Sequence, residues 1–375
     1  MKSFHVHRLA HGHLTLFTDN NEGVLFDTSR QSLTHLTGSL VFAVLQRDTC
    51  TDLGHAISKA SKSVRKSSDD LRDLFSEIEP FFVPGIPEKN YEDGLYPELH
   101  AQPLSTQDML FKVCNTVFSI HCSNDLLRQH LAELLAPISV VTGQHHVSID
   151  ITNSAEDFSL NVNDLPVEQG LLFNEVVPVL IDRLQILAYQ RENFLFCFHG
   201  AAVVTQSGGL LMPGVSGAGK STLAARLCEA GATLYSDEMM VFDEQHSLLT
   251  IPLPIAIKEG SWSLFPQLDK SKIWKRVDGR RLKYLWPEAF STEFPSKRLS
   301  IFPRFGSSAS QPERLSTFQA LSKLVEGGYQ VSRTLTADDI ESLLSMLDSL
   351  PCYQLGYIKT EYAMQMINAA WENPS

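Results

Sequence analysis

The residues of this chain whose types and spacing could do chemistry centre on GVSGAGKST, residues 214–222. The stretch fits the pattern G-x-x-x-x-G-K-[ST] through Gly214, Gly219, Lys220 and Ser221. In such a loop the glycines let backbone N–H groups point at phosphate oxygens, the lysine reaches the β- and γ-phosphates, and the serine hydroxyl binds Mg²⁺. The other loop residues expected to contact a nucleotide are Val215, Ser216, Gly217, Ala218 and Thr222.

The segments on both sides of the loop favour the same interpretation. The apolar run Leu210-Leu211-Met212 predicts a strand before the loop, and STLAARLCEAG predicts an amphipathic helix closed by Gly231. This order places the phosphates at a helix N-terminus, where the dipole and the free N–H groups favour anions. We therefore expect bound ATP or GTP with Mg²⁺, and the pattern does not choose between the two nucleotides.

Two further features lie close to the loop in the chain. His199 comes at the end of an apolar strand, in Phe198-His199-Gly200, although an incidental role is an alternative for any one of 13 histidines. Residues 232–242, ATLYSDEMMVF, predict a single strand with Asp237 and Glu238 in its middle. Adjacent carboxylates in an apolar strand are costly to bury unless they serve a cation or a proton. Their side chains should alternate across the strand, and a solvent-facing pair is the alternative.

The rest of the chain supplies further domains. Its 375 residues are enough for two or three. Alternating apolar residues over 13–28 predict a β-hairpin, three amphipathic helices follow, and a Pro-rich stretch then predicts a linker. We predict an α/β (α+β) protein with a winged-helix-like domain over residues 1–84, a linker that tethers it over 85–107, and the phosphate-loop domain over 108–375.

Composition excludes several classes of function. The net charge of −12 argues against binding to nucleic acid or to anionic membranes. Six cysteines without a C-x-x-C pair, in a chain that opens without an apolar signal segment, favour reduced thiols in a cytoplasmic protein. Oligomeric state is left open, a homo-oligomer included.

The motifs around the loop together resemble those of the HPr kinase family, and more closely the HPr-kinase-related proteins. The shared features are HG before the loop, GxSGxGKS itself, and an acidic pair after one helix. The resemblance runs from about Met109 to the end and includes PLPIAIKEG, IFPRF and LPCYQLGY. It implies a phosphoenolpyruvate-carboxykinase-like P-loop fold and ATP- and Mg²⁺-dependent phosphorylation of a serine or threonine hydroxyl in a peptide or protein.

The resemblance also implies roles for individual residues. Asp237 would be the proton acceptor and His199 its catalytic partner. Lys220 would clamp the phosphates, and Ser221 would hold Mg²⁺ together with Glu238. Candidate phosphate or substrate contacts, from the basic stretch KSKIWKRVDGRRLKY and from the PLPIAIK and FPRF segments, are Lys258, Arg280, Arg281 and Arg304.

The chain also departs from the HPr kinase pattern. Asp-Glu replaces Asp-Asp in the acidic pair, and the family's Glu-x-Arg-Gly-Leu-Gly signature is absent. HPr is therefore not the expected substrate, and phosphate removal is not the expected reaction. For the basic stretch, a solvated loop is the alternative.

Roughly the first eighty residues resemble the PqqD-like family of peptide-recognition modules. The resemblance rests on the opening hairpin, on GVLFD…HLTGSLVFAVLQ and on a Thr-Asp-Leu helix start. It implies recognition of a peptide in modified-peptide biosynthesis. Because a hairpin edge offers unpaired N–H and C=O groups, we expect an extended peptide to bind there as an added strand. A generic α/β domain for dimerisation is the alternative. A small-molecule kinase of the same fold and a non-catalytic nucleotide-binding regulator or scaffold are the alternatives for the whole protein.

Overall fold

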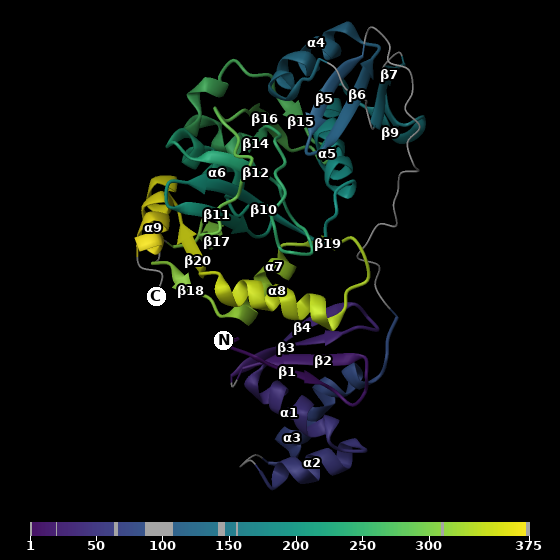
Figure 1. Ribbon diagram of the computed structural model, residues 1–375, viewed down its shortest axis with the longest axis vertical. Coiled ribbons are helices and arrows are strands. Elements are labelled where there is room, and N and C mark those ends of the chain that lie inside the picture. The colour runs from purple at the N-terminus through teal and green to yellow at the C-terminus, as the bar shows by residue number, and fades with distance from the viewer. Residues whose placement is uncertain are drawn as a thin grey trace.

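The computed structural model is a mixed α/β protein whose strands, within the part of the chain that it describes, form four sheets. An N-terminal unit lies at one end, a second unit at the other, and the largest sheet between them (Figure 1). The predicted linker lies outside the described residues, apart from residues 85 and 86. The structure describes residues 2–19, 21–63, 67–86, 108–141, 147–154, 157–308 and 311–372.

The N-terminal unit contains the predicted hairpin and the three predicted helices. The hairpin consists of β2 and β3, but the described sheet has the order β1-β2-β3-β4. Strand β2 therefore also pairs with β1, and β3 also pairs with β4. The free edges of the sheet, which we expected on the hairpin, belong to β1 and β4. The elements are β1 (His5–Arg8), β2 (Leu14–Thr18), β3 (Glu22–Asp27), β4 (Ser32–Thr37), α1 (Gly38–Asp48), α2 (Leu53–Ser61), α3 (Ser68–Ile78) and the 3₁₀ helix η1 (Glu79–Phe82).

Both faces of the N-terminal sheet are buried. Leu16 shares a core with α1, α2 and α3, whereas its neighbour Phe17 belongs to a core that also contains Phe318. Successive strand residues point to opposite faces, so consecutive apolar residues mark a strand that is covered on both sides. Helices α7 (Thr317–Glu326) and α8 (Ala337–Ser349) cover this second face of the sheet. The unit therefore packs directly on the rest of the protein.

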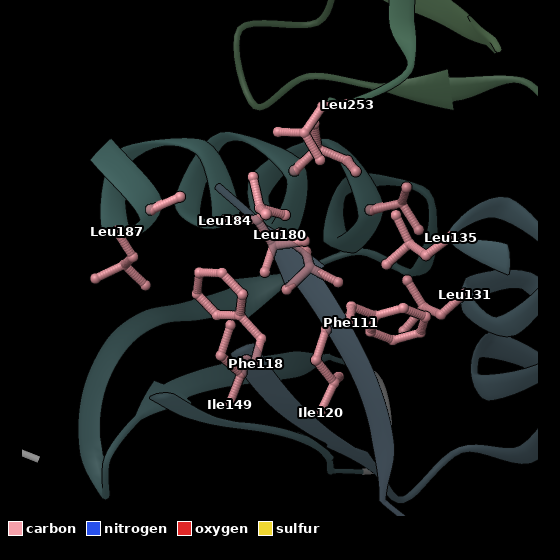
Figure 2. Close-up of a cluster of buried hydrophobic side chains, with 14 of the residues drawn as sticks. Phe111, Phe118, Ile120, Leu131, Leu135, Ile149, Leu180, Leu184, Leu187 and Leu253 are labelled. Atoms are coloured by element: carbon pink, nitrogen blue, oxygen red, sulfur yellow. The ribbon is translucent and has the colours of Figure 1, made fainter. Parts of the chain in front are cut away.

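The second unit is a five-stranded sheet packed against a long helix (Figure 1). Side chains from the sheet and from α5 interlock in its core, among them Phe118, Ile149, Leu180 and Leu184 (Figure 2). Helix α5 also contributes to the candidate site described below. The elements are β5 (Met109–Val113), β6 (Thr116–Cys122), α4 (Asp125–Leu134), the 3₁₀ helix η2 (Ala136–Ile138), β7 (Val147–Asn153), β8 (Phe158–Val162), β9 (Leu165–Leu171) and α5 (Phe173–Gln190).

The central sheet positions the candidate site. Strands β11, β17 and β20 are parallel neighbours, and β10 pairs antiparallel with β11. Helices α6 and α9 cover one face, and α7 and α8 cover the other. The elements are β10 (Phe196–Thr205), β11 (Gly208–Pro213), α6 (Lys220–Glu229), β12 (Thr233–Ser236), β13 (Met239–Phe242), β17 (Arg298–Phe305), β18 (Glu313–Arg314), β19 (Tyr329–Val331), β20 (Cys352–Tyr357) and α9 (Thr360–Glu372).

A small sheet of order β14-β16-β15 completes the surroundings of the site. Its strands β15 and β16 form a hairpin closed by a bond from the Arg276 N–H to the Arg280 carbonyl at 2.8 Å. None of the helices in the described ranges is long and apolar enough to cross a bilayer. The elements are β14 (Ile255–Lys258), the 3₁₀ helices η3 (Glu259–Leu264) and η4 (Pro266–Leu268), β15 (Trp274–Lys275) and β16 (Arg281–Leu285).

Candidate active site

The predicted order of strand, glycine loop and helix is confirmed. The loop leaves β11 at Gly214 and enters α6 at Lys220. Gly219 has a φ of 92°, in the left-handed region that favours glycine. A Cβ atom at this position would also collide with the Tyr357 hydroxyl. The glycine is therefore required by backbone conformation and by close packing together.

Lys220 is buried against the loop that it follows. Its Nζ donates hydrogen bonds to the carbonyl oxygens of Gly214 at 2.7 Å and Val215 at 2.8 Å, and the residue is only 5% exposed. Burial lowers the pKa of its ammonium to about 8, and the charges of Glu238 and Asp237 partly oppose that shift. The cation is thus already positioned at the loop.

The acidic pair lies in a bend, so the prediction of one strand over residues 232–242 is wrong. Strand β12 ends before Asp237, β13 begins after Glu238, and the two strands pair with different parts of β10. Glu238 has a φ of 68°, which is rare for a residue other than glycine. Its carbonyl oxygen accepts a hydrogen bond from the Gly200 N–H at 3.0 Å. This contact helps to hold the strained bend, a feature that clusters at functional sites.

Asp237 is a buried carboxylate that its surroundings compensate only in part. Neither carboxylate oxygen makes a hydrogen bond of good geometry within the described residues, whereas the backbone oxygen accepts one from the Gln185 amide at 2.9 Å. Burial and the Glu238 charge raise the pKa of Asp237, and the nearby Ser221 hydroxyl lowers it. Burying an unpaired carboxylate is costly, so this position suits a cation.

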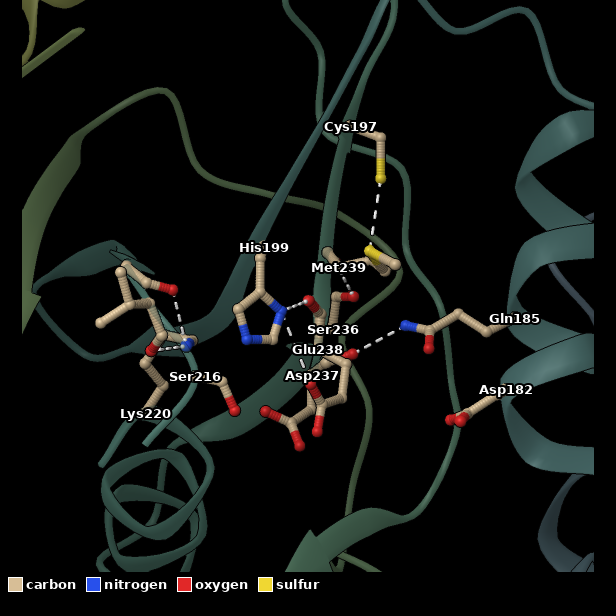
Figure 3. A network of polar contacts seen from close by, with 12 residues as sticks. Asp182, Gln185, Cys197, His199, Ser216, Lys220, Ser236, Asp237, Glu238 and Met239 are labelled. Atoms are coloured by element: carbon tan, nitrogen blue, oxygen red, sulfur yellow. Dashed lines mark hydrogen bonds and ion pairs between the residues drawn. The ribbon is translucent and has the colours of Figure 1, made fainter. Parts of the chain in front are cut away.

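His199 lies inside β10, because the strand continues to Thr205, so its predicted place at a strand end is wrong. From there it faces the same bend. Its Nδ1 lies 2.7 Å from the backbone oxygen of Glu238 and 3.5 Å from Oε2 of the same residue (Figure 3). The carbonyl can only accept, so Nδ1 carries the proton and Nε2 is the basic nitrogen. Burial and the Lys220 charge lower the pKa of the ring below its usual value. This shift favours the neutral form of the imidazole.

Of the four predicted basic contacts, the structure brings two to the loop. Lys258 Nζ lies 3.3 Å and Arg280 Nη1 lies 3.4 Å from the Ser216 hydroxyl. Arg281 points elsewhere, since its guanidinium pairs with Glu259 at 2.6 Å. Arg304 is an exposed residue near the end of β17.

The structure adds Arg276, which sequence reasoning did not single out from the basic stretch. One guanidinium nitrogen lies 3.3 Å from an Asp182 oxygen and another 3.5 Å from a Glu238 oxygen. Burial raises the pKa of Asp182 to about 6, and the Arg276 charge partly opposes the shift. Asp182 interrupts the apolar sequence of helix α5. A charged residue in such a helix was the feature of the sequence that could have indicated a buried ion pair. The position of Arg276 depends on the β15–β16 hairpin, which the local sequence did not reveal.

The glycine loop and the Glu238 side of the bend border one cavity of about 240 Å³. Its walls include His199, Lys220, Ser221, Glu238, Lys258 and Phe305. Asp182, Asp237 and Arg276 line a separate small cavity, which Glu238 also borders. A glycine-rich loop with a buried cation, a carboxylate and an imidazole can bind a phosphate group and move a proton beside it.

A comparison with protein-family models finds no match for this chain, and a comparison with curated proteins finds none either.

Proposed function

We propose that this protein is an ATP- and Mg²⁺-dependent kinase of the HPr-kinase-like P-loop type. It transfers the γ-phosphoryl group to a serine or threonine hydroxyl of a peptide or protein. The observation that carries the proposal is the meeting of the glycine loop and the acidic bend in one cavity, with Lys220, Glu238 and His199 in its wall. The strained backbone at Glu238 favours catalysis over nucleotide binding alone.

The residues present fit a magnesium ion. Asp237 offers two buried carboxylate oxygens that lack hydrogen bonds of good geometry within the described residues, and the Ser221 hydroxyl lies close enough to lower its pKa. Carboxylate and hydroxyl oxygens suit Mg²⁺, which proteins bind with few ligands alongside substrate phosphates. We assign Ser221 and Asp237 as its ligands, in place of the Ser221 and Glu238 pair that the family resemblance implied. Mg²⁺ bound there would neutralise charge on the phosphates.

Glu238 is the better candidate for the proton acceptor. It lines the cavity, and 23% of its side chain is exposed, whereas Asp237 is buried and does not line this cavity. Glu238 takes the proton of the acceptor hydroxyl as the hydroxyl oxygen bonds to the γ-phosphorus. The bond from that phosphorus to the β–γ bridging oxygen breaks, and ADP leaves. His199 positions Glu238 through its backbone carbonyl.

The cations around the loop balance the charge of the transferred group. Lys220 lies at the base of the loop, and Lys258 and Arg280 lie at Ser216. Fixed positive groups aimed at developing negative charge stabilise the transition state without reorganisation. These three residues are therefore assigned to the phosphates.

The N-terminal unit is proposed to bind a segment of the substrate remote from the phosphorylated residue. The edge strand β4 is the proposed site of strand addition, since it is the longer of the two outer strands. This assignment replaces the hairpin strands, which lie inside the sheet.

Transfer of labelled phosphate tests the proposal. The full-length protein is incubated with γ-labelled ATP, Mg²⁺ and a random peptide library that contains serine or threonine. We expect label on peptide serine or threonine, and none with the Lys220→Ala variant. ATP binding without label in any peptide or protein would contradict the peptide-kinase assignment. Label in a small metabolite would instead favour the small-molecule kinase.

A further inference from the structure

We propose that the end of the cavity formed by Phe305, Tyr357 and Leu264 is the subsite for the nucleobase. Phe305 is the ring on which the base stacks. This inference rests on the proposed function, because it requires a nucleotide at the glycine loop. It adds the part of the site that recognises the base, which the loop motif does not contain.

The topology places this aromatic pair beside the loop. Strands β11, β17 and β20 are adjacent and parallel, so their carboxyl ends lie at one edge of the sheet. The loop starts where β11 ends, Phe305 closes β17, and Tyr357 closes β20. In α/β sheets, ligands bind outside the carboxyl ends of parallel strands.

Direct contacts fix the pair to the end of the loop. The Phe305 N–H donates to the Ala218 carbonyl at 3.1 Å, and the Tyr357 hydroxyl donates to the Gly219 carbonyl at 3.3 Å. The two rings meet edge to face, with centroids 5.5 Å apart. Their distance from the loop is therefore set by hydrogen bonds as well as by packing.

Phe305 remains open to the cavity in spite of these contacts. It is 55% exposed, whereas Tyr357 is 1% exposed, and the partly exposed Leu264 lines the same cavity. An aromatic ring fixed in an open position adds little to folding, since burial is what stabilises apolar surface. It does offer a flat apolar surface to a ligand.

The two ends of the loop differ in chemistry, and the difference orients the nucleotide. Lys258 and Arg280 lie at Ser216, near the start of the loop. The aromatic pair lies at Gly219, near its end. The charged end suits the terminal phosphates, and the apolar end suits the base. Every base has a π-face, so stacking on Phe305 serves adenine and guanine alike.

Calorimetric titration of the full-length protein with ATP and with tripolyphosphate, each with Mg²⁺, separates the base from the phosphates. Stacking on an aromatic ring predicts that Phe305→Ala weakens ATP binding roughly tenfold. Tripolyphosphate binding should stay unchanged, and Phe305→Trp should retain ATP affinity. The matched control is Ile358→Ala, which removes an apolar side chain that is 60% exposed just after β20. This control should bind ATP like the wild type.

Three results would overturn the subsite. Equal ATP affinities of the wild type and Phe305→Ala would exclude stacking. Equal losses for ATP and tripolyphosphate would mean that Phe305 only shapes the loop. A wild type that binds neither ligand would overturn the proposed function and the subsite together, which distinguishes that failure from the first two.

Discussion

The Nδ1 atom of His199 lies 2.7 Å from the backbone carbonyl oxygen of Glu238, a residue whose φ is 68°. The same carbonyl also accepts the Gly200 N–H. Two donors from β10 thus hold one oxygen and help to keep the acidic bend in a backbone conformation that costs on the order of 1–3 kcal/mol. His199 therefore acts on the site by holding the bend in position.

Lys220→Ala should abolish phosphoryl transfer and weaken ATP binding. The variant loses a charged donor to the phosphates, worth about 1.5–3 kcal/mol, so ATP affinity should fall roughly 10- to 100-fold. Calorimetry and the transfer assay measure the two effects. The control is Lys270→Ala, which removes an exposed lysine of the basic stretch. Transfer at the wild-type rate by Lys220→Ala would refute the site assignment.

Asp237→Asn and Glu238→Gln should separate metal binding from proton transfer. Glu238→Gln should keep ATP affinity and lower turnover by roughly 10²–10⁴, the usual contribution of a positioned base. Asp237→Asn should raise the Mg²⁺ concentration needed for half-maximal activity. Kinetics at varied Mg²⁺ measure both effects. The opposite outcome, an unchanged Mg²⁺ requirement in Asp237→Asn and normal turnover in Glu238→Gln, would restore Asp237 as the proton acceptor.

The affinity for ATP should fall as the pH rises through about 8. Burial lowers the pKa of Lys220 to about 8, so the free protein loses this positive charge above that pH. The phosphates favour protonated lysine, and binding therefore weakens on the alkaline side. Titrations across this range measure the effect. Lys220→Arg keeps its charge and should lose the dependence, whatever its absolute affinity. An identical pH profile for both proteins would exclude Lys220 as its source.

Gln31→Ala should destabilise the docking of the N-terminal unit. The buried Gln31 side chain donates to the Leu335 carbonyl at 3.1 Å and accepts the Leu335 N–H at 2.7 Å. Losing both bonds leaves buried backbone groups unpaired and should cost about 2 kcal/mol. Urea unfolding measures the change. Gln129→Ala on the exposed face of α4 is the control, and equal stability of the two variants would contradict the role of this contact.

Local patterns predicted the glycine loop, the N-terminal hairpin and the helices. Each of these depends on requirements that lie within a few residues, such as the positive φ of Gly219. The break between β12 and β13 was not predictable in this way, because His199 and Gly200, far away in sequence, hold the Glu238 carbonyl. The strand-like composition around the pair gave the opposite indication.

In the basic stretch, too, local sequence does not predict which residues reach the site. Arg276, Arg280 and Arg281 are close in sequence, yet the first contacts Glu238, the second contacts Ser216, and the third pairs with Glu259. The turn of the β15–β16 hairpin decides which of them reaches the site. For the N-terminal sheet, the sequence did indicate burial on both faces. Val24, Leu25 and Phe26 are consecutive apolar residues of one strand.

The N-terminal sheet is buried between two helical layers, and this limits how its unit could be exchanged for one from another protein. Phe4, Phe17 and Phe26 complete the same core as Phe318 and Ile340, so cutting the chain near residue 84 would expose apolar surface on α7 and α8. A truncated chain should therefore be less stable, and it is a poor test of peptide recognition. A recognition unit grafted from another protein would have to bring side chains shaped for α7 and α8. If the N-terminal unit recognises the substrate as proposed, its specificity could be exchanged only together with that shared surface.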